Sequence, residues 1–518
     1  MQYLVSSAQM KAYDQAAIEN TGIPPLVLME RAACATAEEI IRRFPPEGRG
    51  READKSRVLI LAGCGNNGGD GFAIGRILAE HGYPVSFVLA GERESCSRET
   101  MAQIHILEHL GETVEAAVPE GRFSVIVDAL FGIGLSRNVT GRYEEIISYI
   151  NASAACVVAV DIPSGIHADT GAVMGTAVRA DLTVTYGYAK PGLILYPGGE
   201  YAGEVVCRKI GISCPAGQKP LAFVYDRTDL ARLPVRKNDG NKGSFGRVLV
   251  IAGNERMCGA CQFAALGAYR IGAGLVRVLT VKENRNVLMQ TVPEAIVDTY
   301  DSEVAEACLK ETLDWADCVV AGPGIGTDER ACRIMKYIWS HCRVPLVVDA
   351  DGLNILASCP DWLKRDRDSQ RETGGERGAE VYFTPHLGEF SRLAKKSIKC
   401  CKEDIISAAA SYAREQGVIL VCKDARTVVA DPAGELYLNT SGDNGMATGG
   451  SGDVLAGILA GLLAQGMQGL EAAALAVYLH GLAGNRASSI KSTYAVKAGD
   501  LLEALPQVLT EGGNKGWT

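Results

Sequence analysis

The 518-residue chain is poor in aromatic residues, in histidine and in clustered positive charge. Aromatic residues make up 6% of the sequence, histidine occurs 7 times, and the formal net charge is −9. No run of lysine and arginine marks a surface that would follow nucleic-acid phosphates, so we expect no nucleic-acid partner. No stretch reaches the ~18 consecutive apolar residues of a membrane-spanning helix, so we expect no membrane partner.

We also expect no secretory signal. Residues 1–17, MQYLVSSAQMKAYDQAA, have no basic segment followed by an apolar stretch. The 16 cysteines are scattered through apolar runs, as Cys156 and Cys318 are, where cysteine behaves as a small hydrophobic residue. We therefore expect a protein of the reducing cytoplasm. The one CxxC pair, Cys258 and Cys261, is interpreted as packing, because a lone pair is at most half of a zinc site.

Apolar runs alternate with helical segments in two series, which begin with RVLILAG at residue 57 and RVLVIAG at residue 247. Continuous apolar strands separated by helices indicate an α/β protein with parallel sheets that are covered on both faces. The near repeat does not extend further, so we expect two different domains rather than a duplication. The expected division is 1–213 for the first domain, 214–245 for a linker and the start of the second, and 246–518 for the second domain.

The expected elements follow from this alternation. In the first half the strands are 58–62, 85–90, 124–130, 156–161, 182–187 and 204–210, and the helices are 9–43 (broken at Pro24 and Pro25), 71–82, 97–111 and 141–152. In the second half the strands are 248–253, 275–280, 318–323, 345–351, 381–385, 418–424 and 427–431, and the helices are 259–272, 328–342, 402–416 and long segments after Gly452. The charged stretch 364–379 is expected to be an exposed insertion.

The first candidate site follows the strand 58–62, in the sequence GCGNNGGDG. Gly63, Gly65 and Gly68 have the G-x-G-x-x-G spacing of a dinucleotide-binding turn between a strand and a helix. The spacing alone also fits a tight structural turn. The turn carries side-chain oxygens at Asn67 and Asp70, which suit a hard cation or ribose hydroxyls better than a bare phosphate.

Two further aspartates end predicted strands of the same domain. Asp128 ends SVIVD and Asp161 ends CVVAVD, each before a glycine-containing turn. Ligands of open parallel sheets bind at the carboxyl ends of the strands, so we expect the three acids to share a site. A single aspartate at such a place is often a helix cap, but capping does not explain three of them.

The motifs GCGNNGGDG, VDALFGIG, VDIPSG and TYGYAKPGLILYPG together resemble the NAD(P)H-hydrate epimerase domain, or YjeF N-terminal domain, over roughly residues 1–213. The resemblance implies a Rossmann-like three-layer domain that interconverts the R and S hydrates of NADH and NADPH (NADHX and NADPHX). It implies that Asp161 binds substrate and acts as acid and base, and that Asn67, Asp128 and Ser164 hold K⁺. The implied substrate-binding residues are Asn66, Asn67, Gly68, Gly69, Asp70, Gly132, Ile133, Gly134, Leu135, Ser136, Arg137, Asn138 and Asp161.

The second candidate site is the stretch GDNGMATGGSGDVLAGIL, residues 442–459. Gly449, Gly450 and Gly452 precede an apolar helix that has Asp453 in its first turn. Free N–H groups of such a turn and helix bind anions. Asp453 alone fits a helix cap, but a cap does not need three glycines. The chain has no Walker A sequence, which excludes a P-loop enzyme.

Together with GPGIGTD, VDADGLN, TPHLGE and VCKDARTVVAD, this stretch resembles the ADP/ATP-dependent NAD(P)H-hydrate dehydratases over about residues 220–510. The resemblance implies a ribokinase-like α/β domain, Asp453 as catalytic base, and Gly324, His386 and Asp453 in contact with the hydrated nucleotide. It implies that ADP or ATP, with Mg²⁺, is bound by Lys423, Asp424, Ala425, Arg426, Thr427 and Gly452. Asp424 departs from the family, which usually has glycine there, and an acid beside a polyphosphate is unfavourable.

The two resemblances imply one repair pathway, because an epimerase would supply the S hydrate that a dehydratase uses with ADP. The family tendency also implies a homo-oligomer. Three alternatives remain open. They are an NAD-dependent dehydrogenase that uses the glycine turn and Glu92, a small-molecule kinase fused to a binding domain, and an RNA- or scaffold-binding module.

Overall fold

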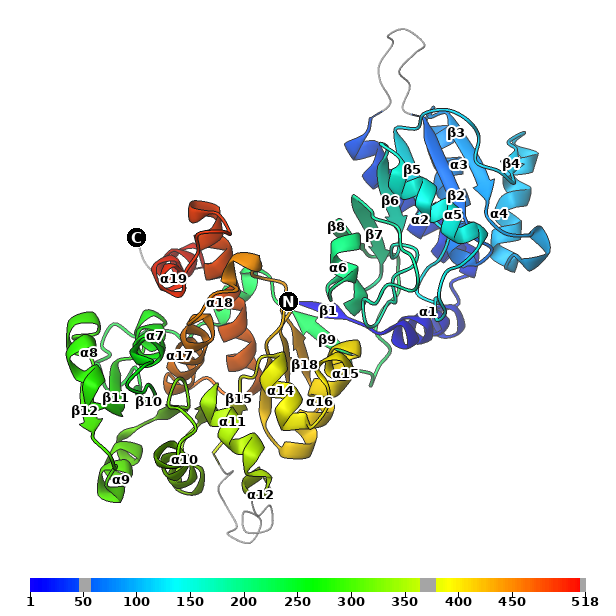
Figure 1. Ribbon diagram of the computed structural model, residues 1–518. Coiled ribbons are helices and arrows are strands. Elements are labelled where there is room, and N and C mark those ends of the chain that lie inside the picture. The colour runs from blue at the N-terminus through cyan, green and yellow to red at the C-terminus, as the bar shows by residue number, and fades with distance from the viewer. Residues whose placement is uncertain (46–56, 364–378, 513–518) are drawn as a thin grey trace. The chain divides into compact units, whose positions relative to one another are not determined.

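The computed structural model describes residues 1–45, 57–363 and 379–512. The chain forms two compact units, Tyr3–Leu221 and Ala222–Thr518, and the second unit also includes Met1 and Gln2 (Figure 1). The division between Leu221 and Ala222 lies inside the segment 214–245. Most of the insertion that was predicted to be exposed, residues 364–378, lies outside the described residues.

The N-terminal unit is built around a seven-stranded sheet with the order β4-β3-β2-β5-β6-β7-β8, in which every pair is parallel (Figure 1). The chain passes from β2 to β3 in one direction and reaches β5 in the other, so a topological switch point lies between β2 and β5. The strands are β2 (Val58–Ala62), β3 (Val85–Leu89), β4 (Val114–Glu115), β5 (Val125–Ala129), β6 (Cys156–Val160), β7 (Leu182–Tyr186) and β8 (Glu204–Arg208). The helices are α1 (Ser7–Thr21), α2 (Pro25–Arg43), α3 (Asn66–Glu80), α4 (Arg98–His109), α5 (Arg142–Ala152) and α6 (Gly198–Tyr201).

Alternate residues of β2 face two different cores. Val58 and Ile60 pack into a cluster with side chains of α2, α3 and α4. Leu59 packs on the other face of the sheet, in a cluster with side chains of α5. All five residues of β2 are buried, as expected for a central strand of a parallel sheet.

Helix α3 begins at Asn66, five residues earlier than the predicted start at Gly71. The glycines inside it allow close packing rather than a wide turn. A Cβ on Gly71 would lie 2.5 Å from the Cβ of Ala129, and one on Gly75 would lie 2.3 Å from the ring of Phe87. Asn66, Asn67 and Asp70 are therefore helical residues, and the first two turns of α3 carry the side chains of the predicted site.

The C-terminal unit contributes strands β9 to β18 to an eleven-stranded sheet with the order β1-β9-β18-β17-β16-β15-β14-β13-β10-β11-β12. In this order, every pair from β16 to β12 is parallel. Strand β17 pairs antiparallel with both β16 and β18. The strands are β1 (Gln2–Leu4), β9 (Ala222–Val224), β10 (Arg247–Ile251), β11 (Leu275–Val281), β12 (Ile296–Tyr300), β13 (Cys318–Ala321), β14 (Leu346–Val348), β15 (Val381–Phe383), β16 (Ile419–Cys422), β17 (Val428–Ala430) and β18 (Leu436–Leu438). The α/β class predicted for both halves is confirmed.

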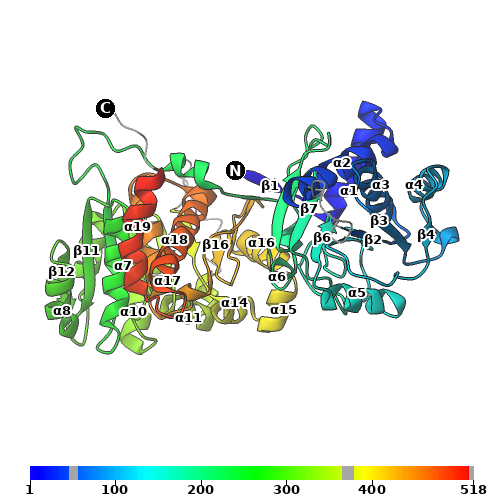
Figure 2. The ribbon, with the colours of Figure 1, turned by 90° about the horizontal axis from the view of Figure 1, so that it is seen from above.

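The helices of this unit flank the sheet, and α7, α17, α18 and α19 lie side by side (Figure 2). They are α7 (Cys258–Arg270), α8 (Arg285–Thr291), α9 (Glu306–Trp315), α10 (Glu329–His341), α11 (Asp351–Ser358), α12 (Pro360–Leu363), α14 (Leu387–Ala394), α15 (Ile398–Glu403), α16 (Ile405–Gln416), α17 (Ser451–Ala464), α18 (Gly469–Lys491) and α19 (Ala498–Gly512). The helix predicted at 402–416 is divided into α15 and α16, because Asp404 caps α16 by accepting a hydrogen bond from the N–H of Ser407.

Five short strands are missing from the predicted set: β1, β4, β9, β12 and β18. They have two to five residues, and β12 is only partly buried, with the burial pattern of an edge strand. Short or half-exposed strands lack the continuous apolar run by which central strands are recognised.

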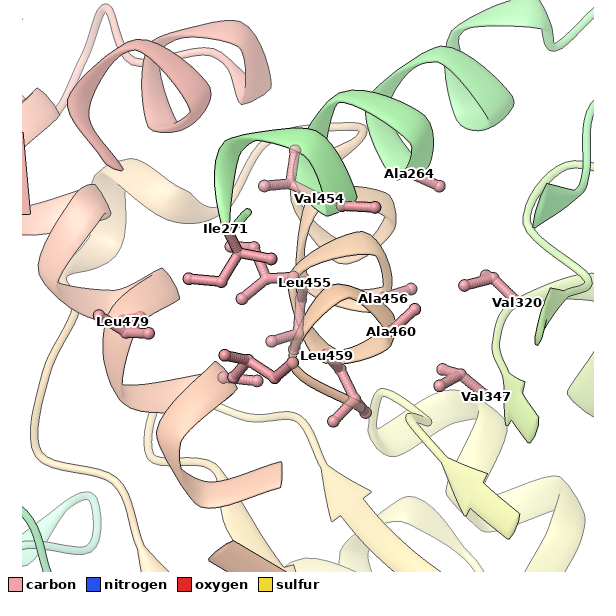
Figure 3. Close-up of a cluster of buried hydrophobic side chains, with 14 of the residues drawn as sticks. Ala264, Ile271, Val320, Val347, Val454, Leu455, Ala456, Leu459, Ala460 and Leu479 are labelled. Atoms are coloured by element: carbon pink, nitrogen blue, oxygen red, sulfur yellow. The ribbon is translucent and has the colours of Figure 1, made fainter. Parts of the chain in front are cut away.

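Helix α17 is the centre of the C-terminal core. Figure 3 shows its side chains in contact with α7 on one side and with Leu479 of α18 on another, while Val320 and Val347 approach from the sheet. A helix that is apolar on every face is buried on every face. Two glycines let α7 and α17 approach backbone to backbone: a Cβ on Gly457 would lie 2.1 Å from the carbonyl oxygen of Ala264, and one on Gly267 would lie 2.7 Å from that of Val454.

Two further predictions concern a membrane-spanning helix and the CxxC pair. None of the helices in these residues combines the length and the apolar character that a membrane crossing needs. Cys258 and Cys261 lie in the first turn of α7. The Cys261 thiol is buried in the core and lies 2.9 Å from the carbonyl oxygen of Cys258.

We predict that Gly457→Ala destabilises the C-terminal unit by about 1–3 kcal/mol, because the new methyl group meets backbone atoms of α7 that cannot move independently. The matched control is Gly259→Ala in α7, where the nearest atom to a Cβ is 3.7 Å away on Phe263. The control should be neutral or stabilising by up to about 1 kcal/mol. Urea denaturation followed by circular dichroism measures both, and equal stability of the two variants would contradict the packing account.

Candidate active sites at the two sheet edges

The predicted residues of the N-terminal unit meet at the carboxyl edge of its sheet. Strands β2, β5, β6 and β7 are consecutive neighbours, and each is followed by one part of the site. A cavity of 790 Å³ opens there, within the size range of pockets for small molecules and cofactors. Its wall includes Asn66, Asn67, Asp70, Gly132, Ile133, Gly134, Leu135, Ser136, Arg137 and Asp161 from the predicted set.

Gly68, Gly69 and Asn138 are the predicted substrate-binding residues that do not line this cavity in the described part of the chain. Both glycines face the protein interior. A Cβ on Gly68 would lie 1.9 Å from the carbonyl oxygen of Gly63, and one on Gly69 would lie 2.6 Å from the side chain of Met29. Their place in the structure is to let α3 start close against the strand end, which positions the neighbouring asparagines.

Asp161 is held in an unusual backbone conformation at the end of β6. Its φ is 66°, a left-handed value that costs a non-glycine residue energy and that clusters at functional sites. Its Oδ1 atom accepts hydrogen bonds from Thr185 Oγ1 at 2.9 Å and from the N–H of Tyr186 at 3.3 Å, and it forms an ion pair with Lys190 Nζ at 2.5 Å. The carboxylate is thus fixed at the cavity wall.

Lys190 is the main site residue that the sequence reasoning missed. Its side chain is 1% exposed, and its Nζ atom also donates to Thr185 Oγ1 at 2.9 Å and to the carbonyl oxygen of Tyr186 at 3.2 Å. The quoted motif TYGYAKPG contains it, so a signal was present. Helix α1 adds Lys11 and Asp14 to the cavity wall, and no motif pointed to them.

Asp128 and Ser164 form a buried polar centre below the cavity. The Ser164 hydroxyl donates to Asp128 Oδ1 at 2.6 Å, and the Ser164 N–H donates to Oδ2 at 2.8 Å. Burial raises the pKa of Asp128 to about 6, although these hydrogen bonds oppose it. Among the described residues no basic side chain pairs with Asp128, and Asn67 Nδ2 is a buried atom without a partner.

The predicted residues of the C-terminal unit also follow neighbouring strands. Strands β13, β14, β15 and β16 are consecutive in the sheet, and Gly324, Asp349, His386 and Lys423 follow them in that order. The backbone N–H of Lys423 donates to the carbonyl oxygen of Pro385 at 2.8 Å, which fixes the last two strand ends together. The glycine turn at the start of α17 completes the site.

Lys423 connects this edge to the glycine turn. Its Nζ atom forms an ion pair with Asp349 Oδ1 at 2.9 Å and would lie 3.0 Å from a Cβ on Gly452. Burial lowers the pKa of Lys423, but the carboxylates of Asp349 and Glu389 outweigh this and raise it overall. The lysine is therefore a permanent cation beside the free N–H groups of the turn, where an anion would bind.

Asp453 lies directly after Gly452 in the first turn of α17, and the φ of Gly450, the residue before this helix, is 90°. Burial and then the charge of Asp349 raise the pKa of Asp453 to about 7, although Lys423 opposes them. Asp453 has no hydrogen-bond or ion-pair partner among the described residues. A carboxyl group with a pKa near 7 beside an anion site has the properties of a general base.

A buried histidine of α18 contacts the glycine turn at the start of α17. The His480 Nε2 atom of α18 lies 3.2 Å from the hydroxyl of Ser451, the residue between Gly450 and Gly452. Burial lowers the pKa of His480 to about 4, so the ring is neutral at physiological pH. A neutral ring adds no charge to the anion site and fixes the position of the turn.

The remaining predicted residues of the nucleotide site occupy the end of β16 and the segment to β17. Asp424, the departure from the family pattern, lies 3.7 Å from Lys402 Nζ of α15, so a cation offsets its charge. Arg426 Nη1 donates to the carbonyl oxygen of Thr440 at 3.3 Å, and Thr427 is buried. Ala425 lies between these residues in the same segment.

His386 and Gly324 lie at the other side of this edge. The His386 Nδ1 atom accepts from the N–H of Gly388 at 3.0 Å and caps α14, while 57% of its side chain stays exposed. A Cβ on Gly324, whose φ is 59°, would lie 2.9 Å from Ala260 of α7. Both residues thus have a structural role, and they follow strands β13 and β15.

Fold and sites together define a two-unit α/β protein with one catalytic-type carboxylate at each sheet edge. Residues 25–192 match the family model of the YjeF-related protein N-terminus, and residues 248–507 match that of NAD(P)H-hydrate dehydratase. The bifunctional NAD(P)H-hydrate repair enzyme of Moorella thermoacetica is 36% identical over 98% of this chain and 96% of its own length. That of Escherichia coli is 33% identical, with 96% and 92% covered. The chain belongs to the family of bifunctional NAD(P)H-hydrate repair enzymes, which confirms the resemblance of the motifs.

Two of the solved structures that match cover a little more than half of this chain. A ribokinase-like superfamily protein of Enterococcus faecalis is 31% identical, covers 57% of this chain and 99% of its own, and has a TM-score of 0.48. An ADP/ATP-dependent NAD(P)H-hydrate dehydratase of Bacillus subtilis, co-crystallised with ATP and Mg²⁺, is 27% identical, covers 55% of this chain and 96% of its own, and has a TM-score of 0.48.

We predict that Asp453→Asn raises the stability of the C-terminal unit at pH 8 but not at pH 4. The native carboxyl has its pKa raised from 3.8 to about 7, so its contribution to stability is complete below 3.8 and is lost as the pH rises through 7. Asparagine never ionises and avoids this loss, which amounts to at most about 4 kcal/mol. Thermal unfolding at the two pH values measures the difference. A variant that is less stable than the parent at pH 8 would contradict the assigned environment.

Proposed function

We propose that this chain repairs hydrated NADH and NADPH in two steps. The N-terminal unit interconverts the R and S hydrates, and the C-terminal unit uses ADP or ATP to convert the S hydrate back to NAD(P)H. The observation that carries the proposal is the presence of two separate carboxylate sites, Asp161 in a 790 Å³ cavity and Asp453 at a glycine turn. Membership of the family supports both halves.

In the epimerase half, the hydroxyl on C6 of the reduced ring must leave and return on the opposite face, assisted by the lone pair of the ring nitrogen. The carboxylate of Asp161, held by Lys190, removes the proton of the water that returns. The turn residues 132–137 and Asn66 line the cavity where the nucleotide would bind. The side chain of Arg137 supplies positive charge for its phosphates.

The buried centre below this cavity fits a potassium ion. Asp128 is a buried carboxylate without a cationic partner in the described residues, and such a charge requires compensation. Rotation of the Asn67 amide would place its oxygen where the unpartnered Nδ2 atom lies. K⁺ held by Asn67, Asp128 and Ser164 would supply a fixed positive charge that stabilises negative charge on the substrate.

We predict that Asp161→Asn lowers the rate of R-hydrate consumption by about 10²–10⁴-fold, because the amide cannot accept the proton. Asparagine tolerates the positive φ of this position, so the backbone conformation is retained. Recovery of NADH absorbance from the pure R hydrate with ADP measures the combined pathway, after subtraction of spontaneous epimerisation. Repair of the S hydrate by the same sample is the control and should be unchanged. R-hydrate consumption at the parent rate would contradict the assignment of Asp161 as the base.

In the dehydratase half, Asp453 takes the proton of the C6 hydroxyl as that oxygen attacks the terminal phosphorus of the nucleotide. The ring nitrogen then expels phosphate, and loss of a proton from C5 restores the dihydropyridine ring. Lys423 and the N–H groups around Gly452 hold the transferring phosphoryl group, so catalysis is mostly placement and charge stabilisation. Gly324 and His386 border the place of the hydrated ring.

Magnesium fits this site as a companion of the nucleotide. In the described residues no group of three or more His, Cys, Asp or Glu side chains is placed to hold a metal. Mg²⁺ is commonly bound by substrate phosphates with one or two carboxylates. Asp349 Oδ2, 3.5 Å from the position of a Cβ on Gly452, is a carboxylate oxygen of this kind. The bound ion would neutralise phosphoryl charge.

We predict that Asp453→Asn abolishes release of inorganic phosphate that depends on the S hydrate and ADP, with a loss of about 10²–10⁴-fold. The same variant is expected to be more stable at pH 8, so its inactivity cannot be attributed to unfolding. A phosphate assay with each hydrate measures the loss, and interconversion of R and S, followed by chromatography, is the control. Phosphate release at more than a tenth of the parent rate would exclude Asp453 as the base.

The same proposal extends to the domain bounds, the cellular location, the partners and the oligomeric state. We infer an epimerase domain of residues 1–213, a segment 214–245 that is a linker and the start of the second domain, and a dehydratase domain of residues 246–518. The sixteen free cysteines agree with a reducing cytoplasm. Small-molecule substrates, without nucleic acid or membrane, and a homo-oligomeric state complete the proposal. Size-exclusion chromatography with light scattering tests the last point.

A further inference from the structure

Four carboxyl groups belong to the cavity wall of the N-terminal unit, and two of them, Asp161 and Asp70, stand in opposite electrostatic settings. Asp161 is engaged by Lys190, by Thr185 and by a backbone N–H. Asp70, at the second turn of α3, has no hydrogen-bond or ion-pair partner among the described residues. Its side chain is partly accessible, and the accessible part lies in the cavity wall. Because polar groups in such positions are normally satisfied, a bound molecule is the partner that Asp70 lacks.

The surroundings of Asp70 favour its neutral form. Burial raises the pKa of Asp70 well above its usual value, and the negative charges of Asp161 and Asp14 act in the same direction. Helix α2 contributes apolar side chains to this wall, including Met29 and Ala32. The other charged and titratable groups that share the cavity are Lys11 and Asp14 of α1, Cys64 after β2, Glu99 of α4, Arg137 after β5, Tyr143 of α5, Asp161 after β6, Tyr186 of β7 and Lys190 after it.

Lys190 does not offset the raised pKa of Asp70, because its positive charge is paired with Asp161 at 2.5 Å. The Tyr186 hydroxyl already has a hydrogen-bond partner, since it lies 2.6 Å from Thr36 Oγ1. Asp161 is therefore paired with a cation, whereas Asp70 is unpaired and its pKa is raised. Two carboxyl groups whose environments drive their protonation apart form an acid and base pair.

We propose that Asp70 is the general acid of the epimerisation and works with Asp161 as the general base. The inference rests on the proposed function of the N-terminal unit. It goes beyond substrate binding, because it assigns Asp70 a proton transfer to the C6 oxygen. The two groups come from different elements of the cavity wall, α3 and the end of β6.

The step balances without any further reactant. The Asp70 carboxyl donates its proton to the C6 hydroxyl as the C6–O bond breaks, and the bond electrons leave with the oxygen as water. The lone pair of the ring nitrogen forms the C=N bond to C6. Water adds to the opposite face of C6, its O–H proton passes to the Asp161 carboxylate, and the C=N electrons return to nitrogen. Proton exchange with solvent resets both groups, and in the reverse direction their roles are exchanged.

The test is Asp70→Asn, which keeps the size of the side chain and removes the proton that is transferred. Pure R hydrate is supplied with saturating ADP, and appearance of NADH is measured from pH 6 to 10. We expect kcat for the R hydrate to fall by about 10²–10⁴-fold. KM should change by less than about 3-fold, because the ground-state contacts are retained. Repair of pure S hydrate by the same sample should be unchanged.

A pH profile distinguishes proton donation from support of the fold. The parent enzyme should lose epimerase activity as the pH rises and Asp70 ionises, and the residual activity of Asp70→Asn should lack this alkaline limb. Asp14→Asn is the matched charge variant. It removes a negative charge that favours protonated Asp70, so the alkaline limb should move to lower pH.

Each alternative outcome overturns the proposal. A raised KM with kcat intact would make Asp70 a binding residue, and a parent enzyme without an alkaline limb would exclude a titrating acid even if Asp70→Asn failed to fold. Failure of the broader function is distinguishable, because the parent itself would then not accelerate consumption of the R hydrate.

Discussion

A buried lysine–aspartate ion pair at the carboxyl edge of the sheet is the feature on which each site depends. Lys190 pairs with Asp161 in the N-terminal unit, and Lys423 pairs with Asp349 in the C-terminal unit. Removing two charges from water is costly, and such a pair persists only where further hydrogen bonds complete it. In both units the lysine follows one strand and the aspartate follows another, so the pair also fixes the strand ends relative to each other.

Each pair leaves a second carboxyl group of its site without a cationic partner. These groups are Asp70 and Asp453, and the pKa of each is raised, first by burial and then by the charge of a neighbouring aspartate. The raised pKa has a different consequence for each group. A protonated Asp70 can donate, whereas Asp453, with a pKa of about 7, can accept a proton beside an anion site at neutral pH. The same electrostatic arrangement thus supports an acid in one unit and a base in the other.

The local sequence was sufficient for the central strands and for the places of most site residues. A parallel strand buried on both faces is a continuous apolar run, and β2, VLILA, was predicted with its observed bounds. Because all strands of such a sheet end at one edge, the residues after them had to converge, as Asp161 and the Asn66–Asp70 turn do. Short edge strands such as β12, with half-exposed mixed sequences, gave no such signal.

By itself, then, the sequence determined the α/β class, the two glycine turns and the carboxylates that follow the strands, since these depend on local pattern and on the direction of the chain. Tertiary structure alone decided which charges meet. Only folding brings Lys190 to Asp161 and Lys402 to Asp424, and only folding buries Asp70. Protonation state depends on burial and on charges from distant segments, and neither quantity can be read from neighbouring letters.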